Sequence, residues 1–214
     1  MMFSPDSLEF LHIDRNLAVV IKPIGVASEG EEGMPGVVKT ALSEKGINCT
    51  VYPLHRLDTA VSGVMVFALN KTSAAKLSAD IAENKMQKEY LAVVHGSPDE
   101  KSGVFKDLLF KDSRKNKSFI VNRMRKGVKE ASLEYEVLGE KNGLSLVRVL
   151  LHTGRTHQIR VQFSGRKMPL YGDGKYGAKD NDNIALFSFR ITLPSGETFS
   201  AKPQNKGPWN MFDI

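Results

Sequence analysis

The sequence predicts an α+β fold, in which helices flank a mixed sheet. Residues 61–95 read as strand, helix and strand, whereas residues 131–151 and 184–202 each read as an antiparallel pair of strands. The sequence contains no internal repeat, low-complexity tract or long linker. With 214 residues, 41% of them hydrophobic, the chain can build a sizeable core in one domain or two closely joined lobes.

The first elements are a short strand and a short helix. Residues 17–22 are apolar and β-branched, and Pro23 ends the strand because it lacks an N–H and has a fixed φ. In residues 36–46 the apolar side chains recur on one helical face, and Gly46 suits the end of the helix.

A strand, a helix and another strand follow. Residues 61–69 are almost continuously apolar, as in a strand covered on both faces, although a buried helix is also compatible with this length. Residues 70–85 carry apolar side chains at helical spacing after a capping residue, Asn70 or Thr72. Residues 88–96 return to strand character, so a right-handed crossover is expected if the two strands are parallel neighbours.

Antiparallel pairs dominate the second half. Residues 131–139 and 144–151 are joined through Lys, Asn and Gly, and residues 184–193 and 197–202 through Pro, Ser and Gly. Both pairs predict hairpins.

A short helix is expected at residues 156–165, between the two pairs. Thr156 is its capping candidate, Ile159 and Phe163 share its core side, and Gly165 suits its end.

The charge balance favours a polyanionic partner. Thirty Lys and Arg against twenty-four Asp and Glu give a net charge of +6, and basic residues cluster at 111–117 and 122–129. A solvated hairpin or loop explains both clusters about as well as RNA contact does. The start of the chain does not resemble a signal peptide, no run is as apolar as a membrane span, and one cysteine excludes an internal disulfide or a thiolate zinc cluster. A cytoplasmic protein without membrane attachment is expected.

Three polar residues, His55, Arg56 and Asp58, stand directly before the apolar run at 61–69. Charged residues are seldom fully buried without partners, so these lie at an exposed strand end or in a paired cleft. On these residues alone a capped turn is the better interpretation, and one His-x-x-Asp pair is a weak metal motif.

A dense polar group surrounds the start of the helix expected at 156–165. It consists of His152, Arg155, His157, Gln158 and Arg160. Donors at a helix N-terminus suit phosphate or carboxylate, and His157 and Arg160 share one face. Tyr90 alone is most simply a core residue, with base stacking as the alternative. Residues 169–177 form a glycine-punctuated turn that serves shape rather than catalysis.

Taken in order, five segments resemble the RluA-type family of pseudouridine synthases over roughly residues 14–177. They are residues 14–28, HRLD at 55–58 with Ser-Gly at 62–63, KEYLAVVHG at 88–96, LLHTGRTHQIRVQF at 150–163 and PLYGDGKYG at 169–177. HRLD and GRTHQIR in this order are highly specific. The resemblance implies isomerisation of selected uridines in structured ribosomal or transfer RNA, without cofactor or metal. It also implies a largely antiparallel mixed sheet in two continuous lobes with a cleft between them.

The resemblance also assigns roles to residues. Asp58 is similar to the catalytic carboxylate, Tyr90 to the aromatic that stacks on the target base, and Arg160 to the arginine that pairs with the catalytic Asp. Arg56 matches an arginine that holds the RNA with its target nucleotide extruded, and Arg155 is expected to contact phosphate. The expected substrate-binding residues are therefore His55, Arg56, Arg155, His157 and Gln158.

Two departures from the family pattern keep alternatives open. Val61 stands where the family usually has Thr, and no room precedes residue 14 for a small RNA-binding domain, so a single catalytic domain over 1–214 is expected, as a monomer. The basic surface and Val61 also fit an RNA-binding or RNA-remodelling protein of the same fold with weak or no catalytic activity. A metal-dependent hydrolase that uses histidines (His55, His152 and His157) is the remote alternative.

Overall fold

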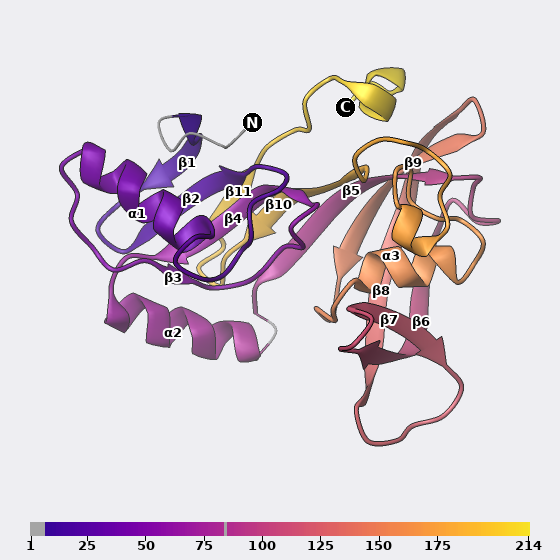
Figure 1. Cartoon of the computed structure of the whole chain (residues 1–214), viewed down its shortest axis with the longest axis horizontal. Helices are drawn as coiled ribbons and strands as arrows, with labels where there is room; N and C mark the ends of the chain where they lie inside the picture. The colour runs from indigo at the N-terminus through magenta and orange to yellow at the C-terminus, as the bar shows by residue number, and fades with distance from the viewer. Residues whose placement is uncertain (1–6, 84) are drawn as a thin grey trace. The chain divides into compact units, whose positions relative to one another are not determined.

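The computed structural model describes residues 7–83 and 85–214, which form two compact units (Figure 1). Unit 1 comprises Met1–Lys88 and Phe187–Lys202, and unit 2 comprises Glu89–Leu186 and Pro203–Ile214. Each unit is therefore built from two separate stretches of the chain.

Unit 1 contains six strands and two helices among its described residues. They are β1 (Phe10–Ile13), β2 (Leu17–Lys22), α1 (Met34–Glu44), β3 (Tyr52–Pro53), β4 (Ser62–Ala68), α2 (Lys71–Ala82), β10 (Leu186–Thr192) and β11 (Thr198–Ser200). The strand order is β1-β2-β4-β10, with β3 also on β4 and β11 on β10. All pairs are antiparallel except β4 with β10, which is parallel through Ser62 opposite Phe187.

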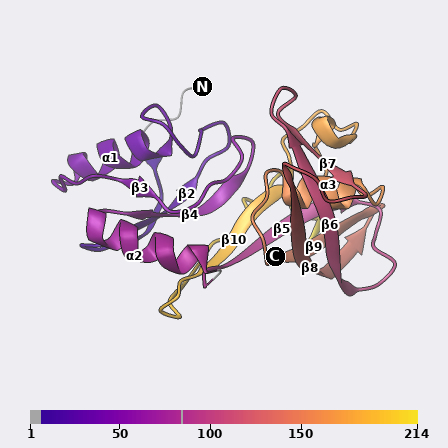
Figure 2. The same cartoon turned by 90° about the horizontal axis from the view of Figure 1, so that it is seen from below.

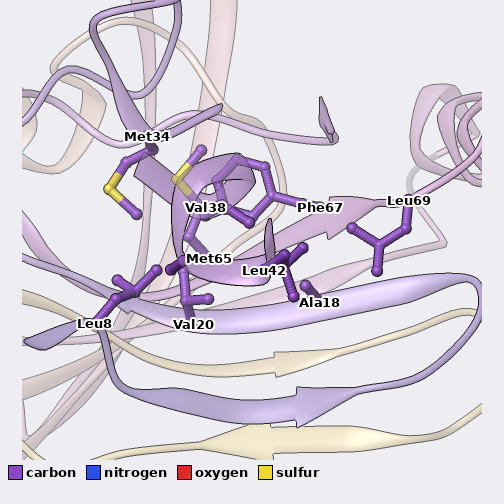
Figure 3. Close-up of a cluster of buried hydrophobic side chains, with 10 residues drawn as sticks. Leu8, Ala18, Val20, Met34, Val38, Leu42, Met65, Phe67 and Leu69 are labelled. Carbon is purple, nitrogen blue, oxygen red and sulfur yellow. The ribbon is translucent and has the colours of Figure 1, made fainter. Parts of the chain in front are cut away.

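The two helices of unit 1 cover opposite faces of its sheet, as Figures 1 and 2 both show. Because side chains alternate along a strand, even-numbered residues of β2 face α1 and odd-numbered ones face α2. Figure 3 shows the first face, where Met34, Val38 and Leu42 of α1 pack with Val20 of β2 and Phe67 of β4. On the other face the half-buried apolar side chains of α2 pack on the buried odd-numbered residues of β2. Both faces of β4 are thus buried, which explains its continuous apolar sequence.

Unit 2 contains an antiparallel sheet and one α-helix among its described residues. They are β5 (Gln87–His95), β6 (Ser102–Asp112), β7 (Lys117–Val121), β8 (Val128–Lys141), β9 (Leu144–Leu151) and α3 (Gln158–Ser164), followed by the 3₁₀ turns η2 (Gly174–Tyr176) and η3 (Gly207–Met211). The strand order is β5-β9-β8-β6-β7, and the pairs β9-β8, β8-β6 and β6-β7 are antiparallel. The ring of Phe163 in α3 lies 5.1 Å from Phe105 in β6 and 6.1 Å from Tyr135 in β8, so α3 covers one face of this sheet.

The structure confirms the mixed, largely antiparallel sheet with flanking helices. It also confirms Asn70 as the cap of α2, whose side chain accepts a hydrogen bond from Ser73 N over 2.8 Å. One expectation was wrong: the residue before α3 is His157 in the left-handed conformation (φ 54°), not a capping Thr156. The parallel neighbour of β4 is β10, so the condition for a right-handed crossover into residues 88–96 is not met.

Candidate active site

Asp58 lies on the loop between β3 and β4, and a backbone turn fixes this loop. The N–H of Val61 donates to the carbonyl of Asp58 over 2.9 Å. Asp58 is half-buried, whereas the side chain at Val61, the position of the departure from the family pattern, packs in the interior with 2% exposure. The loop thus presents a carboxylate at the start of β4, the strand buried on both faces.

A second loop, residues 23–33, fastens the Asp58 loop from its other side. The buried Ser28 hydroxyl donates to the carbonyl of Leu57 over 2.6 Å and accepts from the N–H of Leu57 over 2.9 Å. The N–H of Gly25 donates to the carbonyl of Thr59 over 2.8 Å. Both neighbours of Asp58 in the chain are therefore held by hydrogen bonds to this second loop.

Lys22, the last residue of β2, also binds the Asp58 loop. Its ammonium is fully enclosed and donates to the carbonyls of Pro23 (2.8 Å), Thr59 (3.3 Å) and Val61 (2.8 Å). Burial lowers the pKa of Lys22 to about 8, and the negative charge of Asp58 partly opposes that shift. This role could not be predicted from the sequence, because a lysine at the end of a strand is normally solvated.

The His55 side chain binds the backbone of β4, next to the Asp58 loop. Its Nε2 accepts a hydrogen bond from the N–H of Val66 in β4 over 3.1 Å. Burial, helped by the positive charge of Lys88, lowers the pKa of His55 to about 3, so the ring is neutral and its proton sits on Nδ1. The His55 side chain thus binds a backbone N–H of β4 next to the last β3–β4 partners, Pro53 and Phe67.

Arg56, by contrast, is open to solvent. It pairs with Glu29 of the second loop at 3.2 Å, and both side chains are about 60% exposed (62% and 60%). An ion pair so exposed contributes at most about 1 kcal/mol, so another anion can displace Glu29 from Arg56 at little cost. A pocket of about 820 Å³ opens along the second loop and is lined by Glu29, Glu31 and Glu32, which makes the pocket itself unsuited to phosphate.

Unit 2 holds the other two predicted catalytic residues. Tyr90 lies in β5 and is buried, with 6% exposure. Arg160 projects from the first turn of α3, and its Nε and Nη2 donate to Asp173 Oδ2 (2.7 Å) and Oδ1 (2.8 Å). Its guanidinium carbon lies 5.2 Å from the centre of the Tyr176 ring. The turn at 169–177, expected to serve only shape, therefore supplies two contacts to a predicted catalytic residue.

The remaining predicted residues also lie at the start of α3. His157 Nδ1 is 3.1 Å from the Tyr176 hydroxyl. Gln158 Oε1 accepts from Thr153 Oγ1 (2.7 Å) and from the N–H of Arg155 (3.0 Å), which closes the loop before the helix. Arg155 is half-buried, and its Nε donates to the carbonyl of Glu130 over 2.8 Å. Hence His157 and Gln158 are tied to unit 2, and their contact with substrate stays a prediction.

The basic segment, residues 111–129, occupies the β6–β7 hairpin and the loop that follows it. It carries eight Lys or Arg against one Asp, a net charge of +7, so the rest of the chain sums to −1. Seven of its basic side chains are exposed and make no ion pair within residues 7–83 and 85–214, namely Lys111, Arg114, Lys115, Arg123, Arg125, Lys126 and Lys129. The positive charge of the molecule is thus concentrated on one arm of unit 2.

Across the part of the chain that the structure describes, no three or more His, Cys, Asp or Glu side chains gather as metal ligands. His152 instead pairs with Glu134 at 2.9 Å, on the surface. The hydrolase alternative therefore gains no support. No described helix is both long enough and apolar enough to cross a membrane.

Comparison with known sequences identifies relatives. The profile of a family described as RNA pseudouridylate synthase matches residues 16–165. Ribosomal large subunit pseudouridine synthase C of Buchnera aphidicola (Acyrthosiphon pisum, strain APS) is 34% identical over 174 residues, which are 80% of this chain and 55% of that protein. An uncharacterized RNA pseudouridine synthase of Aquifex aeolicus is 35% identical over 221 residues, covering 97% of this chain and 69% of that one. The chain thus spans little more than half the length of the Buchnera enzyme.

Two solved human structures share the fold. Human RNA Pseudouridylate Synthase Domain Containing 4 superposes with a TM-score of 0.79 at 24% identity, over 92% of this chain and 89% of that one. Domain Containing 1 gives the same TM-score and identity over 97% and 88%.

Proposed function

Since the chain belongs to the RNA pseudouridylate synthase family, we propose that it isomerises specific uridines in structured RNA to pseudouridine, with Asp58 as the catalytic carboxylate. One observation carries the assignment of Asp58. The backbone on both sides of this half-buried carboxylate is held by Ser28, Gly25 and Lys22. A group held so firmly at a strand end is preorganised to react rather than merely solvated.

The reaction accounts for the carboxylate. The C1′–N1 bond of uridine breaks, C1′ bonds to C5 instead, the C5 proton leaves and N1 gains a proton, so the net change is an isomerisation. A carboxylate can attack C1′ or remove the C2′ proton, and both routes start from ionised Asp58. No redox partner or metal is needed to balance either route.

Tyr90 and Arg160 have complementary roles in this proposal. The flat ring of Tyr90 stacks on the uracil, which must stay in place while it turns to offer C5, and Arg160 orients the Asp58 carboxylate. A uridine in folded RNA must first leave its stack. We propose that Arg56 exchanges Glu29 for the RNA and helps to hold that nucleotide out.

The basic segment supports a folded RNA as the substrate. A net charge of +7 on one exposed arm favours the phosphate backbone through counterion release. The Buchnera relative is named for the ribosomal large subunit, so ribosomal RNA is the first substrate to test. Transfer RNA, a cytoplasmic location, a monomeric state and a single catalytic domain formed from both units stay predictions from the sequence.

The test is release of tritium from RNA that is labelled at uridine C5, using transcripts of large-subunit ribosomal RNA and of transfer RNA. Wild-type protein should release tritium, and Asp58→Asn should lose at least about a thousandfold in rate. Asp80→Asn, which removes a carboxylate from the end of α2 in the same unit, should keep the wild-type rate. Equal release by Asp58→Asn and wild type would remove Asp58 from the chemistry.

The basic segment is also compatible with the second candidate function, that of an RNA-binding protein of this fold without catalytic activity. That candidate predicts salt-sensitive binding of both transcripts and no tritium release by wild-type protein. The same assay therefore separates the two functions.

A further inference from the structure

The ion pair between Arg160 and Asp173 is almost fully buried. The side chains are 6% and 0% exposed, and both carboxylate oxygens accept from the guanidinium. A buried ion pair is a weak source of stability, because desolvation offsets most of the attraction between the charges. Stability alone therefore does not explain this ion pair, and Arg160, one of its two members, is a predicted catalytic residue.

The turn that carries Asp173 is built to hold it in one place. The N–H of Asp173 donates to the carbonyl of Leu170, and its carbonyl accepts from the N–H groups of Tyr176 and Ala178. Gly172, just before it, has φ +76°, and a Cβ there would come within 2.2 Å of the carbonyl oxygen of Asn183. Only glycine fits both the conformation and the space.

The geometry of the pair fixes which edge of the guanidinium Arg160 presents. Asp173 takes the side edge, formed by Nε and Nη2, so the end edge with Nη1 is directed elsewhere. The Tyr176 ring limits rotation of the guanidinium plane. The Tyr176 hydroxyl is itself held, since it accepts from the N–H of Ser118 (2.9 Å) and donates to the carbonyl of Ser118 (3.2 Å).

We infer that Asp173 is a positioning residue, which acts through Arg160 by clamping the guanidinium so that its Nη1 edge meets the reacting carboxylate or the RNA. The inference rests on the proposed function. A guanidinium with four rotatable bonds would otherwise sample many orientations, and a displacement of about 1 Å can cost about a hundredfold in rate. In this role Asp173 acts on the reaction only through Arg160.

Asp107 offers a matched control within the same unit. Its carboxylate also binds an arginine beside α3, Arg166, through two N–H groups at 2.9 and 3.3 Å, and it accepts from Gln162 over 2.7 Å. Asp107→Asn and Asp173→Asn therefore each remove one carboxylate charge that binds an arginine in or next to α3. They differ in which arginine loses its anchor.

The experiment compares turnover and RNA affinity for these variants on the tritiated transcript that wild type modifies. Asp173→Asn should lower kcat about a hundredfold and change the RNA dissociation constant less than threefold, whereas Asp107→Asn should keep kcat within threefold. In an Arg160→Gln background, Asp173→Asn should cost less than threefold more, since it acts only through Arg160. If Asp173→Asn does not fold, Asp173→Glu takes its place in the test. This variant keeps the ion pair but shifts the guanidinium, so it should lower kcat about tenfold.

Each outcome decides between defined alternatives. Equal kcat losses for Asp173→Asn and Asp107→Asn, or a full additional loss in the Arg160→Gln background, would show that Asp173 only supports the fold. Wild-type kcat in Asp173→Glu would also overturn the inference. If wild-type protein itself releases no tritium, the proposed function fails, and the inference fails with it. A loss confined to Asp173 variants of an active enzyme would support both.

Discussion

Replacement of the buried Lys22 by Met should change how stability depends on pH. Met has a similar length and no charge, so it removes the ammonium while largely preserving the volume. The variant loses hydrogen bonds to three carbonyls, those of Pro23, Thr59 and Val61, and it also loses the cost of burying a charge. These two effects oppose each other at pH 7, and both change when Lys22 loses its proton, so the pKa of Lys22 gives their net dependence on pH.

The magnitude follows from the pKa of Lys22. The folded value of about 8 lies below the ordinary value of 10.5, so the unfolded state binds more protons between these two pH values. The stability of the wild type therefore rises with pH in this range, and below pH 8 the full penalty applies. Between pH 7 and pH 10 the wild type should gain about 2.5 kcal/mol relative to Lys22→Met.

Urea denaturation at pH 7, 8, 9 and 10 measures this difference. Circular dichroism should follow unfolding, because the single tryptophan, Trp209, lies in unit 2 and Lys22 in unit 1. Lys76→Met, on the exposed side of α2, is the control and should show a difference from wild type that stays constant over the same pH range. A constant difference between wild type and Lys22→Met, within about 0.5 kcal/mol, would refute the account of Lys22.

Two further predictions concern a glycine and the basic segment. Gly63 has φ +121°, and a Cβ there would come within 2.4 Å of the carbonyl oxygen of Ser188. Gly63→Ala should therefore lower the free energy of unfolding, measured by urea denaturation, by at least about 3 kcal/mol. Gly46→Ala, at a positive φ but with open space around it, should lower the same free energy by about 1 kcal/mol. Joint replacement of Arg114, Lys115, Arg123 and Lys126 by Gln should lower the slope of log affinity against log salt by about 3 in RNA binding, and an unchanged slope would remove this arm from the interface.

Most elements of the fold could be predicted from local sequence patterns. The capping side chain of Asn70, the Asn-Gly turn between β8 and β9 and the apolar run of β4 each depend on residues close in sequence, and each was readable. For the β6–β7 hairpin the sequence indicated only a solvated hairpin or loop, without strand bounds, because its many charges mask the alternation on a sheet with one exposed face. The pairing of β4 with β10 joins residues more than 120 apart, which no local pattern encodes.

The candidate site shows the same division. The family motifs named Asp58, Tyr90 and Arg160, but the groups that hold Asp58 and Arg160 were missed. Asp173 looked like part of a loop, because its partner lies thirteen residues earlier, across a turn whose path depends on Gly172. Its burial depends on tertiary packing rather than on its neighbours in sequence. An acidic residue between two glycines in a loop is a weak signal, and it gains meaning only once a buried arginine is known nearby.

The stability that is lost by burying the Lys22 ammonium must be compared with the structural role of this group. At pH 7 a lysine with a pKa of about 8 penalises folding, and an apolar residue would end β2 without that penalty. The ammonium, however, is compact and carries three donors, so it can reach the carbonyls of Pro23, Thr59 and Val61 together. Those carbonyls belong to the two loops that meet around Asp58. The stability lost by burying one charge is therefore exchanged for a fixed loop, as expected where a reacting group must be held still.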